Sequence, residues 1–164
     1  MTQTVVQTIN ELVDYDKFTG RFYTKTQKHK ELHANEDLYI VLFHKHKRWK
    51  VKANKLAYEL GTQTKIPDDY VVLHRNLDKQ DFRLCNLMIV PSTTMQQITE
   101  AHRNLSSDLK ITPHPKDIFA YVVSWIEHRQ QKRKVVHDVV AAKQLYTKLQ
   151  LRYAKVLGKY LVLD

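Results

Sequence analysis

One segment limits the fold more than any other part of the chain: residues 72–87, VLHRNLDKQDFRLCNL. It contains a polar run between two short apolar segments. The apolar residues up to Leu73 predict a short buried strand that enters His74. Residues 84–90 are apolar enough for a short helix or a strand. Short elements joined by a polar loop are typical of a small domain that mixes helices with strands, so the fold class we expect is α+β.

Two hairpins and a short helix are predicted before this loop. Gly20 marks the turn of a first hairpin within residues 11–24. A second hairpin, within residues 38–53, alternates apolar with basic residues and has a strongly basic turn. Asn54 is suited to cap the helix that follows, and Gly61 is suited to end it.

The last part of the chain, residues 116–164, is predicted to be helical throughout, because apolar residues recur there at helical spacing. One apolar stripe consists of Ile118, Tyr121, Val122, Trp125 and Ile126. A second apolar face follows Asp138, a residue suited to cap a helix. Serines and prolines before residue 116 favour an extended crossing. We therefore expect a domain at residues 1–105, a linker at 106–115 and a helical domain at 116–164.

The charge balance indicates which class of molecule the protein binds. Lysine and arginine total 27 against 17 acidic residues, which gives a net charge of +10 and favours a polyanion such as nucleic acid. The single cysteine, Cys85, excludes an intramolecular disulfide and suits a reducing cytoplasm, and we expect it to be a small buried residue. The first residues do not read as a signal peptide, and no apolar run approaches the roughly 20 residues needed to span a bilayer.

Several short motifs occur in a characteristic order. They are Tyr15-Asp16, Thr19-Gly20, Phe22-Tyr23, Leu56-Ala57, and then His74, Asn76, Asp81, Arg83, Asn86 and Leu87. Over about residues 11–100, this order resembles the HNH homing-endonuclease family that is common in phage genomes. The resemblance implies an N-terminal ββα-type HNH-like domain with short hairpins, in a protein from a phage or another mobile element that acts in the cytoplasm of a bacterial host.

The departures from that pattern concern the metal site. Active members of the family place an Asp directly before the His and an Asn on a later segment, and these two residues hold a divalent ion. In this chain Leu73 and Met95 stand at those positions, and Asn54 replaces a frequent His. Leucine has no donor atom, and a thioether is a poor ligand for a hard cation. We therefore expect no metal, no cofactor and no catalytic residue, with His74 and Asn86 as remnants.

The remnant residues have a structural interpretation. In the family that the chain resembles, an Asn at the position of Asn86 ties the loop together by hydrogen bonds. We expect Asp81 and Arg83 to pair with each other or to cap the same loop, and His74 to be a hydrogen-bonded structural residue.

Two basic regions are candidates for DNA contact. The predicted contacts are Lys45, Lys47, Arg48, Lys50, Lys52, Lys55, Arg129, Lys132, Arg133, Lys134, Lys148 and Arg152. For the basic hairpin, the alternatives are a charged turn that prevents edge-to-edge pairing and a zinc site from His44 and His46. For residues 116–164, the alternatives are a helical module that reads DNA or dimerises, and a helical hairpin that packs on the N-terminal part.

The function predicted from the sequence is sequence-specific binding of double-stranded DNA without cleavage, as in a transcriptional repressor. A palindromic target would imply a homodimer. One alternative is an active HNH-type homing endonuclease or nickase in which Asp78 or Asp81 reaches a metal beside His74. Another is a phage inhibitor that binds a host protein, whose mostly apolar interface would be less sensitive to salt than DNA binding.

Overall fold

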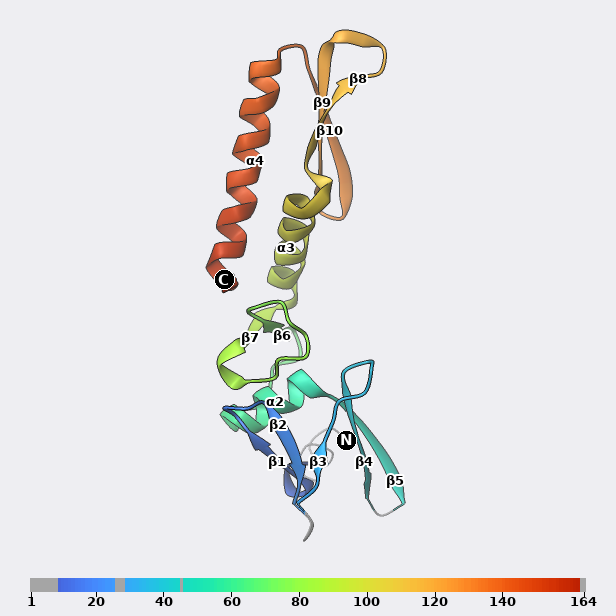
Figure 1. Ribbon diagram of the computed structural model, residues 1–164, viewed down its shortest axis with the longest axis vertical. Coiled ribbons are helices and arrows are strands. Elements are labelled where there is room, and N and C mark those ends of the chain that lie inside the picture. Colours follow the sequence, from blue (N-terminus) through green and yellow to red (C-terminus); the bar gives the residue numbers. More distant parts are fainter. Residues whose placement is uncertain (1–8, 26–28, 45, 163–164) are drawn as a thin grey trace. The chain divides into compact units, whose positions relative to one another are not determined.

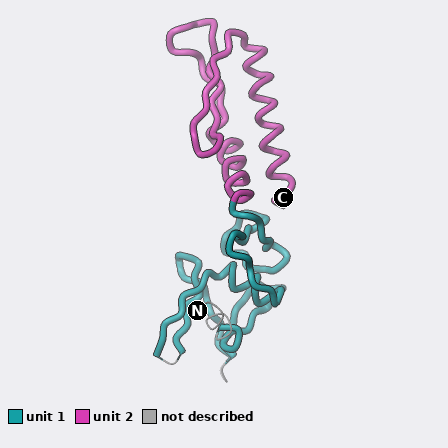
Figure 2. Tube along the Cα trace, turned by 180° about the vertical axis from the view of Figure 1, so that it is seen from behind, with its two compact units in different colours: residues 1–92, 164 teal, residues 93–163 magenta. Residues whose placement is uncertain are grey.

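The computed structural model describes residues 9–25, 29–44 and 46–162. The chain mixes helices with small antiparallel sheets and divides into two compact units. Unit 1 ends at Ser92 and unit 2 begins at Thr93 (Figure 2). None of the described helices is both long and apolar enough to cross a membrane.

Unit 1 begins with a three-stranded antiparallel sheet, β1–β2–β3 (Figure 1). Strand β1 spans Val13–Asp16, β2 spans Arg21–Thr24 and β3 spans Glu31–Leu32. The first two strands form the hairpin predicted around Gly20, whose φ of +73° lies in the left-handed region that glycine adopts without a steric cost.

The second predicted hairpin is also present. It pairs β4 (Tyr39–His44) with β5 (Lys47–Lys52). Helix α2 (Ala53–Thr62) follows directly. Asn54 is not its cap, because the helix already begins at Ala53, and the helix ends one residue beyond Gly61.

A third pair of strands carries the polar loop. Strand β6 (Tyr70–His74) pairs antiparallel with β7 (Leu87–Pro91), and a 3-10 turn, η1 (Leu84–Asn86), immediately precedes β7. Residues 84–90 thus contain both alternatives, a short helical turn and then a strand. Cys85 lies in η1 and is exposed, so the expectation that it is buried was wrong.

The core of unit 1 forms where α2 meets the strands. Its buried members are Ile9, Val13, Phe22, Ile40, Leu42, Ala53, Leu56, Ala57 and Leu87. Alternate residues of β1, β2 and β4 point into this core, as expected for strands with one face in water.

Unit 2 contains two helices and a three-stranded meander. Helix α3 (Ser92–Arg103) continues into a π-helical turn, η2 (Asn104–Asp108). Strands β8 (Lys110–His114), β9 (Asp117–Glu127) and β10 (Gln130–Val136) form an antiparallel sheet with β9 in the centre. Helix α4 (Val139–Tyr160) contacts all three strands.

The prediction of helix throughout residues 116–164 was wrong for residues 117–136, which form β9 and β10. The apolar run in β9 is rich in β-branched and aromatic residues, which favour a central strand. A continuous apolar run matches the helical period as well, so spacing alone misled the prediction. The helix predicted after Asp138 is present, and the Asp138 carboxylate accepts hydrogen bonds from the backbone N–H groups of Val140 and Ala141.

The expected linker was also wrong. Residues 106–115 contain part of η2 and the whole of β8, which pairs with β9. The two units meet at Ser92 and Thr93, which the sequence had placed inside the first domain. The polar segment before β8 is held to the sheet because the side chain of Asn104 makes two hydrogen bonds with the backbone of Ile126. Its Oδ1 accepts the Ile126 N–H, and its Nδ2 donates to the Ile126 carbonyl.

Candidate nucleic-acid interface

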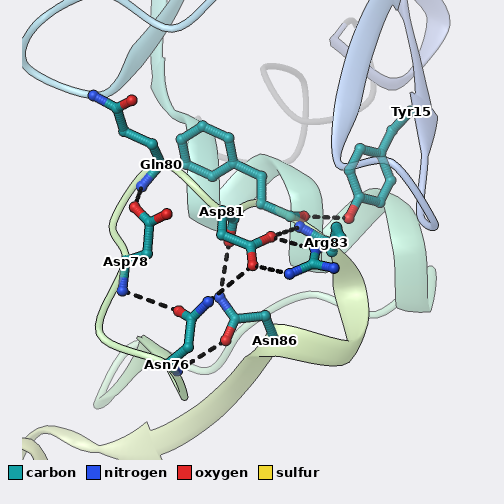
Figure 3. A network of polar contacts seen from close by, with 8 residues as sticks. Tyr15, Asn76, Asp78, Gln80, Asp81, Arg83 and Asn86 are labelled. Carbon is teal, nitrogen blue, oxygen red and sulfur yellow. Dashed lines mark hydrogen bonds and ion pairs between the residues drawn. The ribbon is translucent and has the colours of Figure 1, made fainter. Parts of the chain in front are cut away.

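The β6–β7 loop has His74 at its start and Asn86 at its end. Strand register places His74 opposite Leu87 and Leu73 opposite Met88. Leu73 is 2 % exposed, so its side chain is buried. The loop itself is polar and is held by side-chain hydrogen bonds to the backbone (Figure 3).

Asn86 closes this loop, as predicted. Its Oδ1 accepts the backbone N–H of Asn76 at 2.9 Å, and its Nδ2 donates to the backbone carbonyl of Asp81 at 3.0 Å (Figure 3). The backbone N–H of Arg75 donates to the carbonyl of Asn86 at 2.9 Å. One buried side chain therefore satisfies backbone groups from both arms of the loop.

Asp81 is the second centre of the network. Arg83 donates to both of its carboxylate oxygens, and Asn76 Nδ2 donates to Oδ2 at 2.9 Å (Figure 3). The backbone N–H of Arg83 donates to Oδ1 at 3.1 Å. The predicted pairing of Asp81 with Arg83 is therefore confirmed. These donors, chiefly the guanidinium, lower the pKa of Asp81 to about 2.

The first hairpin packs against the β6–β7 loop at Phe82 and Leu84. Tyr15 Oη donates to the carbonyl of Phe82 at 2.6 Å, and the backbone N–H of Leu84 donates to the carbonyl of Lys17 at 3.0 Å. Burial raises the pKa of Tyr15. A Cβ at Gly20 would lie 2.7 Å from the backbone nitrogen of Arg83, so glycine is required there by a close approach as well as by its φ.

His74 is buried, with 8 % of its surface exposed. Its ring lies 6.0 Å from that of Phe82 in an edge-on arrangement. Burial holds the pKa of His74 below its usual value of 6.5, although Asp78 and Asp81 act in the opposite direction. Its Nε2 atom has no hydrogen-bond partner among the described residues. The expectation of a hydrogen-bonded structural His is therefore not met at this nitrogen.

The side chains at the expected metal-ligand positions do not fit a divalent ion. Leu73 is a buried hydrocarbon, and Met95 lies on α3 with a thioether as its only side-chain acceptor. Asp81 already accepts from Arg83 and Asn76. Within the described part of the chain, no cluster of three or more His, Cys, Asp or Glu residues is placed to hold a metal ion, and His44 and His46 belong to no such group.

The β4–β5 hairpin arranges its cations on one face. The pairs Tyr39–Lys52, Val41–Lys50 and Phe43–Arg48 share this face, because directly opposed residues in an antiparallel pair point to the same side. The other face carries Ile40 and Leu42, which belong to the core. We call the first the ribbon face and define its cations as Arg48, Lys50 and Lys52, all of which are exposed.

Two predicted contacts lie off the ribbon face. Lys47 pairs with His44 on the opposite side of the hairpin. Lys55 lies on α2, where its ammonium is 4.0 Å from the carboxylate of Glu59. Lys45 lies outside the described residues.

Unit 2 divides its predicted contacts between the two sides of its sheet. Register places Lys110, Ser124 and Arg133 in one row across the three strands, and Lys110 and Arg133 are exposed. The neighbouring row, Ile111–Val123–Lys134, contains Val123, which is completely buried, and Ser124 is also buried at 6 % exposure. Both rows are therefore buried at the central strand and carry exposed cations on the flanking strands, and we call the side with Lys110 and Arg133 the sheet face. Lys110 was missed because it lay in the expected linker.

The remaining predicted contacts have other positions. Lys132 and Lys134 lie on β10 on the side opposite Arg133. Lys148 and Arg152 lie on α4, and Arg152 Nη1 donates to Glu127 Oε1 at 2.9 Å. Arg129 lies in the turn between β9 and β10.

That turn depends on Glu100 of α3. His128 and Arg129 both have positive φ, 51° and 62°, in a two-residue hairpin loop of the kind that usually contains Asn and Gly. The Glu100 carboxylate accepts the backbone N–H groups of His128 at 3.1 Å and Arg129 at 2.9 Å. Glu100 therefore stabilises a backbone conformation that these residue types disfavour.

Residues 60–96 match the HNH endonuclease family. The matched segment contains β6, the polar loop and β7, whose geometry is described above. Among solved structures, the chain is similar to one described as DNA binding and cleavage by the HNH homing endonuclease I-HmuI. That likeness has a TM-score of 0.41 and 16 % sequence identity, and covers 82 % of this chain and 76 % of that one. A comparison with curated proteins found no relative.

Proposed function

We propose that this chain binds double-stranded DNA with an HNH-type scaffold and does not cut it. The observation that carries the proposal is Leu73, a buried hydrocarbon directly before His74 in a segment that matches the HNH endonuclease family. The loop hydrogen bonds of Asn86 and Asp81 explain why the motif can persist without a metal, since they satisfy backbone groups that any folded loop must satisfy.

In this proposal each unit contributes its own cationic surface to DNA binding, the ribbon face in unit 1 and the sheet face in unit 2. Alternate residues of a strand are about 6.6–6.8 Å apart, so Arg48, Lys50 and Lys52 form a row of three cations along one strand. A two-stranded ribbon is narrow enough for the major groove. The sheet face adds Lys110 and Arg133.

The biological role that we propose is transcriptional repression in a phage or mobile element. A protein that occupies a long site without cutting it blocks transcription there. DNase footprinting on DNA from the element tests this role, and a palindromic footprint would predict a homodimer. A reporter placed behind the footprinted site should be silenced by the intact chain, and full expression would contradict repression.

Salt dependence tests the DNA-binding part of the proposal. Fluorescence anisotropy with a labelled duplex at 50 and 200 mM salt should show affinity falling by about a thousandfold if six or more phosphates are contacted. An inhibitor of a host protein with a mostly apolar interface would show no such fall. Undetectable binding to any duplex at 50 mM salt would refute the proposal.

A nickase is the second candidate, and one observation favours it. The buried Nε2 of His74 has no partner among the described residues, which is the state expected of a nitrogen reserved for a ligand. Calorimetric titration with Mn²⁺ tests it. Mn²⁺ binding that disappears in His74→Ala and persists in the unit 2 variant His114→Ala would favour a rebuilt metal site, whereas no binding favours the first proposal.

A further inference from the structure

Phe43 is exposed at the outer end of the ribbon face. It is 77 % exposed, in a strand whose inner residues Ile40 and Leu42 are almost fully buried. Its position is set by strand register rather than by a loop, because it pairs directly with Arg48, one pair before the end of the hairpin. The hairpin extends away from α2, so its outer end is free of the unit 1 core (Figure 1).

The other apolar residues of the ribbon face are covered. Lys50 Nζ lies 4.1 Å from the centre of the Tyr39 ring and 3.8 Å from Asp37 Oδ2. Val41 is half-buried. None of the ring–ring or cation–ring contacts found among the described residues involves Phe43. An aromatic ring is thus presented without cover beside a row of cations.

Charge complementarity identifies the occupant of this surface. Arg48 and Lys52 attract a polyanion to the face on which the Phe43 ring stands. Proteins that bend duplex DNA commonly insert an apolar side chain between base pairs, which unstacks one step while neighbouring cations hold the phosphates.

We propose that Phe43 is a wedge that inserts between two base pairs of bound duplex DNA and unstacks them. This inference rests on the proposed DNA binding. The ring replaces part of the stacking that the bases lose, and Arg48 neutralises the adjacent phosphate. Pyrimidine–purine steps are the expected sites, because they unstack most easily.

The test uses the intact chain. Duplexes that bind to it are first selected from a randomised pool, and 2-aminopurine is then placed at successive pyrimidine–purine steps of the selected duplexes. Binding is followed by anisotropy, and unstacking by the rise in 2-aminopurine fluorescence at saturating protein. Phe43→Ala should weaken binding roughly 5- to 150-fold and remove the fluorescence rise. Phe43→Leu should retain part of both, and Arg48→Ala should weaken binding but keep the rise at saturation.

Phe18 provides the matched control. It is 78 % exposed in the β1–β2 turn, and Lys17 Nζ lies 5.2 Å from its ring centre. Phe18→Ala should leave affinity and fluorescence unchanged. Binding with no fluorescence rise, or equal effects of Phe18→Ala and Phe43→Ala, would overturn the wedge and leave DNA binding intact. Absence of duplex binding by the unaltered chain would overturn both proposals.

Discussion

The guanidinium of Arg83 donates to both carboxylate oxygens of Asp81, the acidic residue at the centre of the β6–β7 loop. This pairing determines what the loop can do. A carboxylate that already accepts from Arg83 and Asn76 stabilises the loop, and its oxygens are not free for a cation. The polar residues of this loop, which lies in the segment that matches the HNH endonuclease family, therefore take part in the folding of the segment.

Replacing Asn86 tests how much the loop depends on one side chain. Asn86 is 7 % exposed, and Asn86→Ala would leave the N–H of Asn76 and the carbonyl of Asp81 without their partner. Each unsatisfied group costs about 1–3 kcal/mol, so for the two groups we expect the unfolding free energy to fall by about 2–6 kcal/mol. Urea denaturation measures this. Gln80→Ala, at an exposed position of the same loop, should change stability by less than about 0.5 kcal/mol; an equal loss in both variants would contradict the network.

Acid should destabilise the loop through Asp81. Its pKa is lowered to about 2 in the folded state from 3.8, so its contribution is fully present above pH 4 and is lost as pH falls towards 2. The contribution is up to about 2 kcal/mol. Urea midpoints measured across this range should fall less steeply in Asp81→Asn. An unchanged acid slope would show that Asp81 gains nothing from Arg83 on folding.

His74 should act in a separate, higher pH range. Burial lowers its pKa in the folded state, so the unfolded chain binds the proton more readily. Stability is therefore complete above the unfolded pKa of about 6.5 and declines as pH falls below it. In His74→Gln, the difference in urea midpoint between pH 7.5 and pH 5 should shrink. If the change in urea midpoint between pH 7.5 and pH 5 is the same in the unaltered chain and in His74→Gln, His74 is hydrated in the folded state.

The β9–β10 turn should depend on Glu100. Glu100→Ala removes the acceptor for two backbone N–H groups in a turn with two disfavoured φ values, and we expect a loss of about 1–2 kcal/mol. Adding His128→Asn and Arg129→Gly should restore most of that loss, because Asn-Gly suits this turn. Thermal denaturation measures both variants, with Gln97→Ala on the same helix as control. If the added substitutions do not restore stability, the role assigned to the turn is contradicted.

The ribbon face should determine part of the salt dependence. Arg48→Ala combined with Lys52→Ala removes two cations from one face, so the slope of log affinity against log salt should become shallower by about 1.8. Lys65→Ala combined with Lys143→Ala removes the same charge from exposed positions outside both cationic faces. Equal changes in slope for the two double variants would mean that net charge, rather than the ribbon, attracts DNA.

Unit 1 was largely predictable because local sequence patterns marked its first two hairpins. Gly20 marked the first hairpin, the alternation around Trp49 marked the second, and the pairing of Asp81 with Arg83 followed from the resemblance to a known family. What the sequence did not reveal is which cations share a face. That depends on strand register, which separates Lys47 from Arg48.

Unit 2 was less predictable for two physical reasons. The β9 sequence is apolar on both faces, so helical and strand spacing fit it equally. The turn that should have revealed a hairpin consists of His128 and Arg129, which give no turn signal by themselves. Its partner Glu100 lies far away in the sequence, so only the folded chain shows why the turn forms.

The most direct test of the central claim is a plasmid assay. Supercoiled plasmid carrying candidate target DNA is incubated with the intact chain and Mg²⁺ or Mn²⁺, and gels are run before and after protein is stripped from the DNA. If the chain binds DNA without cutting it, the plasmid is shifted by the protein and returns intact and supercoiled. Nicked or linear plasmid that disappears with EDTA and in His74→Ala would contradict that claim and establish a nuclease.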